Sequence, residues 1–454
     1  MILHKNLKKI LVNKNFSLIK VLQIIEMNGY NSVFVCNKNL NLLGIISDSD
    51  IRKLILKGKF NKNIKAKDIM TKNFFSIPRQ SSFDEYQKIL IRSEKVIIPI
   101  LENKKLVDFI HIRDLKLSAE KKTKKRILII GGCGYIGSIL TKNLLKKGHK
   151  VNILDKNFYG NYFSKKIKKN KNLKIIIGDC FNKIDLKKAL KDCKHVIHLG
   201  EIVGDPAASL NIDFSIRNNY ENTNFVLSEC IKNNIEKFLF ASSCSVYGQS
   251  VNLCNEKSEL NPLSMYAKCK IASEKALLSY KSKDFCPVIL RLSTVYGDSF
   301  RTRLDLVVNR FVIMAINKIQ INLFGAKSWR PFISVNDVAL AFEKFLNSNP
   351  KKIKNQIFNV GGKNENYRII DIVKIIKKYL PINYSYVKNV DDERNYRVSF
   401  KKIKNKVNFN TKDNLNKIIK KLILEYKKNK TNINNINYYN EKKIRSILIK
   451  LKKK

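Results

Sequence analysis

The chain has few of the residues that build metal sites and disulfide frameworks. It contains five histidines among 454 residues, and its nine cysteines form no Cys-x-x-Cys pair or other ligand cluster. An odd number of cysteines without a recurring spacing argues against a disulfide framework. We therefore expect reduced thiols, a cytoplasmic location and no metal site.

Long apolar segments are also missing. The start, Met1-Ile2-Leu3-His4-Lys5, lacks the apolar core of a signal peptide. No uninterrupted stretch of the sequence approaches the roughly 20 apolar residues that cross a bilayer. We expect a soluble protein without a membrane span.

Acidic residues are scarce as well: 37 Asp and Glu stand against 89 Lys and Arg, and the formal net charge is +52. Such a charge suits nucleic acid or an anionic membrane surface as a partner. The basic residues are nevertheless spread along the whole chain, are mostly lysine, and form no aromatic-interleaved stripe, zinc pattern or helix-turn-helix pattern. The charge is better explained as a compositional habit, so no specific nucleic-acid partner is expected. A basic surface would still help to attract an anionic nucleotide substrate.

The chain does contain two regions of different texture. Its length and its hydrophobic content of 44% predict two or three globular domains. A polar linker, residues 119–125, separates residues 1–118 from the rest. Within residues 1–118, the segment that starts at Leu42 is echoed by the segment that starts at Leu106. In each copy an amphipathic helix and a short strand come first, and a second strand then runs into a helix. The two upstream helices are expected at residues 18–27 and 83–93.

This internal repeat resembles a tandem pair of CBS domains. The resemblance implies an adenosine ribose held by a Ser/Thr-x-x-Asp motif where the last strand meets the following helix. Ser47 and Asp50 match that motif in the first copy. The second copy offers His111 and Asp114, and Asp108 replaces the usual glycine. Two roles stay open for the pair: an adenine-nucleotide site, or a structural dimerisation module that binds no nucleotide.

The most informative motif follows the linker. An apolar strand, residues 126–130, runs directly into Gly131, Gly134 and Gly137. Glycines at this spacing turn the chain, let the backbone approach a pyrophosphate and pack the next helix against the strand. The sequence therefore predicts a dinucleotide-binding loop, followed by a helix over about residues 136–147 that ends at Gly148.

A second strand, residues 150–155, ends in Asp155. An acid near this offset from the glycines accepts hydrogen bonds from the hydroxyls of the adenosine ribose. Because the same carboxylate disfavours a 2′-phosphate, the predicted cofactor is NAD rather than NADP.

Strand and helix patterns continue to alternate beyond Asp155. Further strands are expected at residues 174–179, 195–199 and 238–242. Regular alternation predicts the α/β class, with a doubly wound parallel Rossmann sheet over residues 126–290. A smaller substrate-binding region, residues 291–426, is expected to be interleaved with that sheet. The Lys/Asn-rich tail, residues 427–454, is expected to be loosely ordered.

Three residues in this region suggest hydride-transfer chemistry. Ser243 follows the strand at 238–242, and Tyr266 and Lys270 lie four residues apart, hence on one face of a helix. A phenol ordinarily loses its proton near pH ~10, and a lysine one turn away would stabilise the phenolate. Ser243 could then donate a hydrogen bond to a substrate oxygen that alternates between alcohol and ketone.

Taken together, residues 125 to about 425 resemble an extended short-chain dehydrogenase/reductase of the nucleotide-sugar epimerase/dehydratase family. The resemblance is carried by the glycine loop, Asp155, Gly178-Asp179, His198-Leu199-Gly200, the segment 219–223, and Ser243 with Tyr266 and Lys270. It implies that Asp179 meets the adenine and that Leu199 and Gly200 line the cofactor. The cofactor-binding residues that it implies are Gly131, Gly134, Tyr135, Ile136, Gly137, Asp155, Asp179, Cys180, Leu199, Gly200, Asn219, Tyr266 and Lys270.

The same resemblance points to residues that hold the substrate. Arg330 lies in a segment similar to the family's Arg-x-(Tyr/Phe)-Ile-x-Val-x-Asp, and Asp392-Glu393-Arg394 looks like its second arginine clamp. A planar guanidinium suits bidentate recognition of a nucleotide diphosphate. Asp205 either touches the hexose or has a capping or turn role. The further substrate candidates are Ser243, Ser245 and Asn309.

The residues after Ser243 narrow the reaction. Family dehydratases place an Asp-Glu pair after the catalytic Ser/Thr, and decarboxylases keep a Glu there. This chain has Cys244-Ser245, which disfavours both reactions. We expect NAD-dependent epimerisation of a nucleotide-diphosphate sugar, most often at C4, through a transient keto sugar. A nucleotide-sugar reductase or dehydrogenase and a catalytically silent nucleotide-sensing scaffold are the alternatives. The resemblance also implies a homodimer or higher homo-oligomer and a role in making cell-surface polysaccharide.

Overall fold

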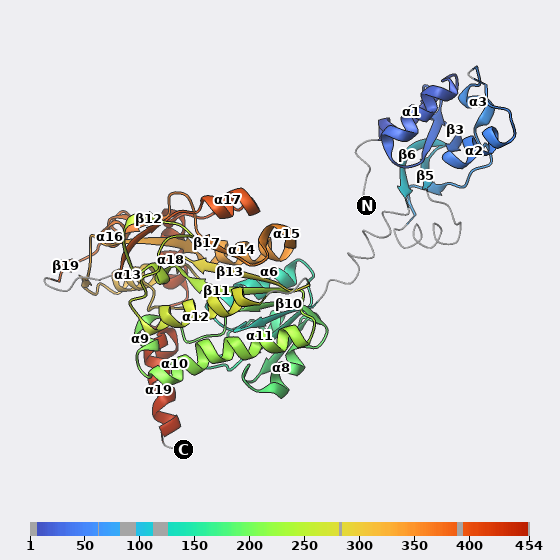
Figure 1. The fold of residues 1–454 in the computed structure, drawn as a ribbon. Helices are drawn as coiled ribbons and strands as arrows, with labels where there is room; N and C mark the ends of the chain where they lie inside the picture. The colour runs from blue at the N-terminus through green and yellow to red at the C-terminus, as the bar shows by residue number, and fades with distance from the viewer. Residues whose placement is uncertain are drawn as a thin grey trace. The chain divides into compact units, whose positions relative to one another are not determined.

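The computed structural model describes residues 7–61, 63–81, 97–111, 126–280, 284–387 and 394–452. The chain forms two compact units, Met1–Lys124 and Lys125–Lys454 (Figure 1). The boundary between them falls at the end of the predicted linker, whose residues lie outside the described ranges.

The first unit consists of two halves with the same sheet topology. Each half has a three-stranded sheet in which a parallel pair is followed by an antiparallel pair, in the orders β1-β2-β3 and β4-β5-β6. The elements are η1 (Leu7–Ile10), β1 (Leu11–Asn13), α1 (Leu18–Asn28), β2 (Ser32–Cys36), β3 (Leu42–Ser47), α2 (Asp48–Leu56), α3 (Ala66–Ile69), β4 (Ile77–Pro78), β5 (Ile97–Glu102) and β6 (Lys105–His111). The repeated topology corresponds to the repeat in the sequence. The helix expected at residues 83–93 lies outside the described residues.

A shared core joins the two halves. The rings of Phe34 in β2 and Phe109 in β6 lie 5.7 Å apart between centroids, and both side chains are buried with Ile97. Aromatic pairs at this separation contribute beyond the area they bury. Neither half therefore completes its apolar core without the other.

The second unit is built on a parallel sheet of seven strands within the described residues, in the order β17-β13-β11-β10-β7-β8-β9. All neighbours in this sheet pair in parallel. The strands are β7 (Arg126–Ile130), β8 (Val151–Asp155), β9 (Leu173–Ile177), β10 (Cys193–His198), β11 (Lys237–Ser243), β13 (Cys286–Leu292) and β17 (Gln356–Val360). The strand order reverses direction between β7 and β10, so the sheet is doubly wound. This confirms the predicted fold class.

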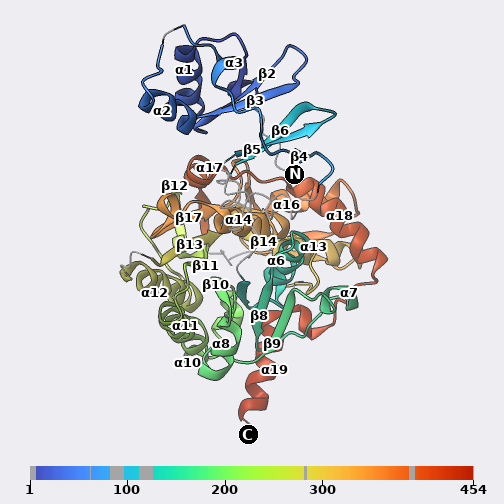
Figure 2. The ribbon, with the colours of Figure 1, turned by 90° about the vertical axis from the view of Figure 1, so that its right-hand side faces the viewer.

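Helices cover both faces of the sheet. One face packs on α6 (Tyr135–Lys146), α14 (Val335–Asn347) and α17 (Lys401–Val407). The other packs on α8 (Lys183–Leu190), α11 (Asn222–Lys232) and α12 (Met265–Ser279). Both ribbon views separate these two groups of helices (Figures 1 and 2). Because β17 and α14 follow residue 291 yet belong to these layers, the last third of the chain is interleaved with the Rossmann sheet.

A second apolar core lies under three helices of the smaller region, α13 (Val307–Ile316), α16 (Ile369–Lys377) and α18 (Leu415–Lys428). Short sheets join it to the main body, in the orders β14-β16-β18, β12-β20 and β15-β19. Their strands are β12 (Gln249–Cys254), β14 (Thr294–Tyr296), β15 (Ile321–Leu323), β16 (Trp329–Ser334), β18 (Asn366–Arg368), β19 (Tyr384–Tyr386) and β20 (Asn395–Val398). The remaining helices are α7 (Lys165–Lys168), α9 (Asp205–Ala208), α10 (Ile212–Ile216), the π-helical η2 (Arg217–Glu221), η3 (Cys244–Tyr247), α15 (Pro350–Ile353), η4 (Ile436–Tyr438) and α19 (Asn440–Lys452).

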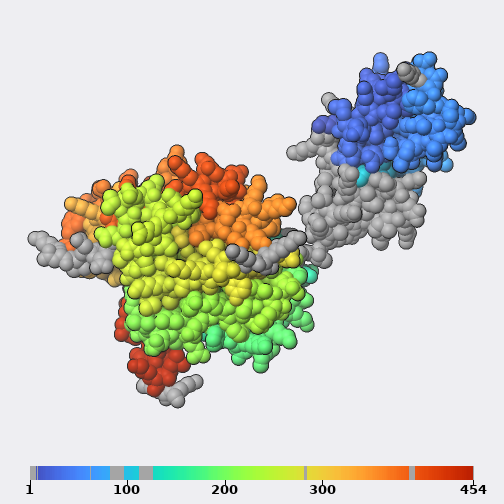
Figure 3. All heavy atoms as spheres, in the orientation of Figure 1, coloured from blue at the N-terminus to red at the C-terminus, as the bar shows by residue number. Residues whose placement is uncertain are grey.

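The prediction of a loosely ordered tail is wrong for the described part of residues 427–454. Helix α19 buries Ile444 against Ile202 and Ala207. Asn440, at 1% exposure, donates to the carbonyl of Val203 at 2.9 Å and accepts from Arg301 at 2.7 Å. The far end of α19 projects from the surface of the unit (Figure 3). The Lys/Asn-rich composition concealed a few apolar residues at helical spacing, and these are the ones that pack.

All nine cysteines lie in the described ranges, where each is buried and free. Among the described residues, no helix is both long enough and apolar enough to cross a membrane.

Candidate active site

The glycine loop brings the backbone of β7 against the loop that follows β10. Gly131 has a φ of +79°, and a Cβ there would lie 2.7 Å from the nitrogen of Gly200. A Cβ on Gly137 would lie 2.7 Å from the Cα of Gly132 and would strike the carbonyl of Gly131. Gly134 is the N-cap of α6, with no side chain over the helix end. At Gly131 and Gly137 only glycine fits, and the close approach of backbone leaves the amides at the helix N-terminus open to a pyrophosphate.

Asp155 ends β8 beside that cradle. Its carboxylate accepts hydrogen bonds from the amides of Cys133 at 2.9 Å and Asn157 at 2.8 Å. Burial raises the pKa of Asp155, while those two amides and Arg301 act in the opposite direction. An acid held at this edge of the sheet fits the ribose of NAD, so the residues present match the predicted cofactor.

The other predicted cofactor residues fall into two groups. Asp179 follows β9 and pairs with Lys156 at 2.9 Å, next to the buried Cys180. Leu199 and Gly200 follow β10, and the amide of Leu199 donates to the carbonyl of Ile130, which binds this loop to the end of β7. These residues, like Ile136 in the first turn of α6, lie along the carboxyl edge of the parallel strands.

The side chains of Tyr135 and Asn219 are buried and form hydrogen bonds to the protein backbone. The Tyr135 hydroxyl donates to the carbonyl of Gly297 at 2.6 Å. The Asn219 side chain accepts a hydrogen bond from the backbone amide of Ile202 at 2.8 Å and donates one to its carbonyl at 2.9 Å. Asn219 lies in the π-helical turn η2, a distortion that often occurs at functional sites. We infer that both side chains shape the loops around the cofactor rather than contact it.

Ser243, Tyr266 and Lys270 come together at the carboxyl end of β11. Ser243 interacts with the Tyr266 phenol and accepts from the amide of Ser245 at 3.1 Å. The Lys270 ammonium lies 5.5 Å from the centre of the Tyr266 ring and donates to the carbonyl of Ala241. Helix α12 therefore presents the tyrosine and the lysine to the strand that carries the serine.

A buried carboxylate, Glu201, joins this group and was not predicted. It forms an ion pair with Lys270, and both side chains are 3% exposed. The pattern that could have indicated it is simple: an acid directly after a buried strand lies at the same edge as Ser243, because the strands are parallel. A single glutamate that belongs to no recognisable motif gives no sign of a functional role, and so Glu201 was not predicted from the sequence.

Glu201 changes the electrostatics expected at Tyr266. Burial raises the pKa of Tyr266, Lys270 lowers it, and the Glu201 and Asp205 carboxylates raise it again. The predicted action of Lys270 has the right direction, but here it does not prevail. Burial lowers the pKa of Lys270, whereas Glu201 and Tyr266 raise it. The net shift is upward, so Lys270 stays protonated.

Next to Ser243, Tyr266 and Lys270 lies a polar network on α12, β11 and β13. Arg291 makes a bidentate ion pair with Glu274, through contacts of 3.0 and 2.6 Å, and both side chains are 3% exposed. The Ser242 hydroxyl donates to Glu274 at 2.5 Å. Arg291 also donates to the Tyr247 hydroxyl at 2.9 Å.

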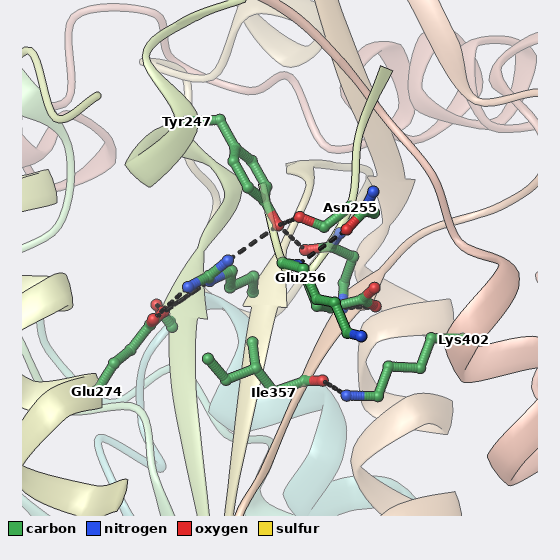
Figure 4. Close-up of polar contacts among 10 residues, drawn as sticks. Tyr247, Asn255, Glu256, Glu274, Ile357 and Lys402 are labelled. Atoms are coloured by element: carbon green, nitrogen blue, oxygen red, sulfur yellow. Dashed lines mark hydrogen bonds and ion pairs between the residues drawn. The ribbon is translucent and has the colours of Figure 1, made fainter. Parts of the chain in front are cut away.

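Figure 4 shows how this network reaches β17 and α17, which follow residue 291 in the chain. The Tyr247 hydroxyl lies 2.8 Å from the amide oxygen of Asn359 and 2.9 Å from the carbonyl of Asn255. Glu256 accepts from the amide of Asn359, and Lys402 donates to the carbonyl of Ile357. The network thus connects α12 and β11 to the interleaved part of the chain.

The two predicted diphosphate arginines approach the same tyrosine. Arg330, at 5% exposure, lies 5.5 Å from the centre of the Tyr396 ring. Burial raises the pKa of Tyr396, and Arg330 and Arg394 both lower it. Arg394 contacts Asp205 at 2.6 Å, and Asp205 accepts from Ser264, the N-cap of α12, at 2.6 Å. Asp205 thereby links Arg394 to the N-terminus of α12.

The two remaining substrate candidates differ. The Ser245 hydroxyl is buried and has no hydrogen-bond partner among the described residues, which leaves it available to a ligand. Asn309 is 0% exposed, donates to the carbonyls of Gly297 and Arg303, and accepts from the amide of Gly297. These bonds give Asn309 a structural task in the loop after β14, so we leave it out of the proposed substrate site.

In the first unit, Ser47 and Asp50 occupy the start of α2. Ser47 is its N-cap, and a capping box joins the two residues in both directions. The Ser47 hydroxyl donates to the Asp50 carboxylate at 2.5 Å. Asp114 lies outside the described residues.

Comparisons with known proteins agree with this division. The CBS domain model matches residues 6–57 and 66–120, and the model of the NAD dependent epimerase/dehydratase family matches residues 127–361. An uncharacterized UDP-glucose epimerase of Bacillus subtilis is 31% identical over 269 residues, which are 56% of this chain and 81% of that protein. A UDP-N-acetyl-alpha-D-glucosaminuronate decarboxylase of Bacillus cytotoxicus is 28% identical over 291 residues, 62% of this chain and 88% of that protein.

Among solved structures, the UDP-glucuronic acid 4-epimerase of Bacillus cereus, in complex with UDP-glucuronic acid and NAD, has a TM-score of 0.60 at 26% identity. The match covers 67% of this chain and 100% of that one. The cofactor is NAD, in keeping with the cradle and Asp155. With a tandem pair of CBS domains in front, the chain belongs to the NAD dependent epimerase/dehydratase family.

Proposed function

We propose that the chain is an epimerase that acts on a nucleotide-diphosphate sugar, at C4 of the hexose. The observation that carries the proposal is the meeting of Ser243, Tyr266 and Lys270 beside the glycine cradle, with Cys244 and Ser245 where a dehydratase or decarboxylase would need a carboxylate. The similarity to a protein named as a UDP-glucose epimerase supports it.

Each residue then has a defined task. Bound NAD supplies the acceptor, and afterwards the donor, of the hydride from the sugar carbon. Tyr266 removes the proton of the C4 hydroxyl as the carbon becomes a ketone, and returns it when the opposite face is reduced. Ser243 donates a hydrogen bond to that oxygen throughout. Arg330 and Arg394 hold the diphosphate, so that the sugar can turn while the nucleotide stays in place.

The test is incubation of the purified chain with UDP-, GDP-, CDP- and dTDP-hexoses, followed by chromatographic separation of the epimers. We expect interconversion of one pair without net consumption of NADH. Tyr266→Phe should lower turnover by about 10³-fold, because a positioned acid-base group contributes roughly 10² to 10⁴. Full turnover in Tyr266→Phe would contradict the proposal, and stoichiometric oxidation of added NADH would identify a reductase instead.

For the first unit we propose an adenine-nucleotide site at Ser47 and Asp50. Support comes from their position at the N-terminus of α2, where a serine hydroxyl and a carboxylate lie side by side. Calorimetry of the full chain with AMP, ATP and S-adenosylmethionine tests it, with Ser47→Ala as the matched variant. Absence of heat with all three nucleotides would favour the dimerisation role. The homodimer is likewise a proposal, which sedimentation of the full chain would check.

A further inference from the structure

Glu201 occupies a position that the proposed reaction leaves without a role. It follows Leu199 and Gly200 at the end of β10, so it projects from the loop that borders the cofactor cradle. Its side chain is 3% exposed, and its close polar partners among the described residues are Lys270 and, at 3.4 Å, the hydroxyl of Thr223. A carboxylate in such a place is expensive to bury.

Fold stability is a poor reason to retain this carboxylate. A buried ion pair often adds little net stability compared with an apolar pair of similar volume. The Thr223 hydroxyl already lies 2.5 Å from the carbonyl of Asn219 and 3.0 Å from the His198 ring, so its bond to Glu201 is secondary. The strong contact of Glu201 is therefore with Lys270, the residue that faces Tyr266.

Lys270 is close to both of the other groups. Its ammonium contacts the Glu201 carboxylate and lies 5.5 Å from the centre of the Tyr266 ring. It also lies 4.7 Å from the ring of Phe240, an apolar neighbour that excludes water. Burial raises the pKa of Glu201, and the ion pair with Lys270 lowers it. In its charged form Glu201 counteracts the pull that Lys270 exerts on a phenolate.

The surrounding groups do not duplicate this effect. The charged groups that act on Tyr266 are Lys270 on its own helix, Glu201 after β10 and Asp205 on α9, and the Ser243 hydroxyl at the end of β11 also reaches it. Asp205 is already paired with Arg394. His198 faces Lys270 from β10 as a neutral ring, since burial lowers its pKa to about 3. Burial keeps Cys180 and Cys269, which lie near Glu201, as thiols by raising the pKa of each, to about 12 and about 11. Glu274, the remaining acid near Lys270, is held by Arg291.

We propose that Glu201 is a positioning residue that sets the proton affinity of Tyr266 through Lys270. This inference rests on the proposed role of Tyr266 as the acid-base group. A reaction that takes a proton and later returns it needs a phenol that keeps the proton between the two half-reactions. Lys270 alone would favour the phenolate, and the Glu201 carboxylate restores the tendency of Tyr266 to hold the proton.

The test measures the ionisation of Tyr266 directly, without substrate. Fluorotyrosine is placed at position 266 of the full chain, and its ¹⁹F resonance is titrated with pH in the wild type and in Glu201→Gln. Removal of a charge within a few ångströms shifts a pKa by about one pH unit or more. We expect the midpoint in Glu201→Gln to be lower by about that amount, and the midpoint in Glu201→Asp to be lower by less.

Glu343→Gln is the matched control. Glu343 is also a buried glutamate in an ion pair with a lysine, Lys147, but it lies on α14, on the face of the sheet away from α12. Its removal should leave the Tyr266 midpoint unchanged. An unchanged midpoint in folded Glu201→Gln would overturn the inference. If that variant does not fold, an unchanged midpoint in Glu201→Asp would do so.

The kinetic arm separates this inference from the proposed function. If a nucleotide sugar is turned over, the acidic limb of kcat/KM should move to lower pH in Glu201→Gln, because the base form of Tyr266 becomes available sooner. A lowered ¹⁹F midpoint without turnover of any nucleotide sugar would sustain the role of Glu201 and count against the epimerase. Turnover of a nucleotide sugar, with the same ¹⁹F midpoint in the wild type and in Glu201→Gln, would support the epimerase and overturn the role of Glu201.

Discussion

Helix α12 contributes one residue to each of two buried ion pairs, and the two pairs differ in how many further hydrogen bonds they make. Lys270 and Glu274 lie four residues apart on that helix, and their partners are Glu201 and Arg291. The Arg291–Glu274 pair is bidentate and is bonded further by Ser242 and Tyr247, so its geometry is fixed on several sides (Figure 4). Among the described residues, the Lys270–Glu201 pair makes few further hydrogen bonds: Lys270 donates to the carbonyl of Ala241, and Glu201 accepts from the hydroxyl of Thr223.

The difference shows how one helix can carry both a framework and a chemical group. A fully bonded pair cannot change its protonation without the loss of several interactions, so it holds α12 against β11 and β13. A pair with few other bonds, placed against a phenol, can influence a proton on that phenol. We therefore assign a structural role to Arg291–Glu274 and a tuning role to Lys270–Glu201.

The largest expected effect tests the framework. Glu274→Leu leaves the Arg291 guanidinium buried without its carboxylate, and we expect it to lower the free energy of unfolding by about 3 to 5 kcal/mol. Denaturant unfolding at pH 7 would measure this. The double variant Glu274→Leu/Arg291→Met should recover most of the loss, because an apolar pair replaces the ion pair. A double variant as unstable as the single one would show that the cost arises from packing rather than charge.

Another buried carboxylate, Glu365, extends the comparison to an acid that pairs with no cation in the part of the chain that the structure describes. Glu365 is 6% exposed, and its side chain accepts a hydrogen bond from Tyr296 at 3.5 Å. Burial raises the pKa of Glu365 from its ordinary value of 4.5 to about 7, Tyr296 lowers it, and the acids Asp337 and Asp413 raise it. Glu365 therefore keeps its proton at pH values where an exposed glutamate has lost it.

The consequence is a stability that depends on pH. Between pH 4.5 and about 7 the folded state holds a proton that the unfolded state has lost, so stability falls as the pH rises through this window. Glu365→Gln, which mimics the neutral acid, should stabilise the chain by up to about 3 kcal/mol at pH 8. Below pH 4.5 it should have little effect. Thermal unfolding at pH 5 and pH 8 checks this, and an equal effect at both values would contradict it.

These comparisons also mark what the sequence could and could not predict. The cradle of Gly131, Gly134 and Gly137 and the placement of Asp155 were predictable, because the local order of strand, glycines, helix and acid determines them. Tyr266 and Lys270 were predictable because a spacing of four puts two side chains on one helix face. Such signals are contained within one or two neighbouring elements.

The features that sequence reasoning missed or interpreted differently depend on contacts between distant segments. Glu201 meets Lys270 across 69 positions of the chain, and no local pattern marks that pair. Asn309 was a predicted substrate candidate, and its amide is instead hydrogen-bonded to the turn at Gly297. The order of the C-terminal segment likewise rests on Asn440, which bonds the loops at Val203 and Arg301. Composition carries no information about such contacts.

The smallest expected effect concerns the outer part of the framework. Tyr247→Phe removes a hydroxyl that accepts from Arg291 at 2.9 Å and lies 2.8 Å from the amide oxygen of Asn359. Because Arg291 keeps its bidentate partner, we expect a loss of only about 1 to 2 kcal/mol in the free energy of unfolding. The ¹⁹F midpoint of Tyr266 should not change, although Tyr247 belongs to η3, the turn that begins after Ser243. A lower midpoint in Tyr247→Phe would mean that the framework also adjusts the phenol. The division between a structural pair and a tuning pair on α12 would then fail, because any loosening of the helix would produce the effect that we assign to the charge of Glu201.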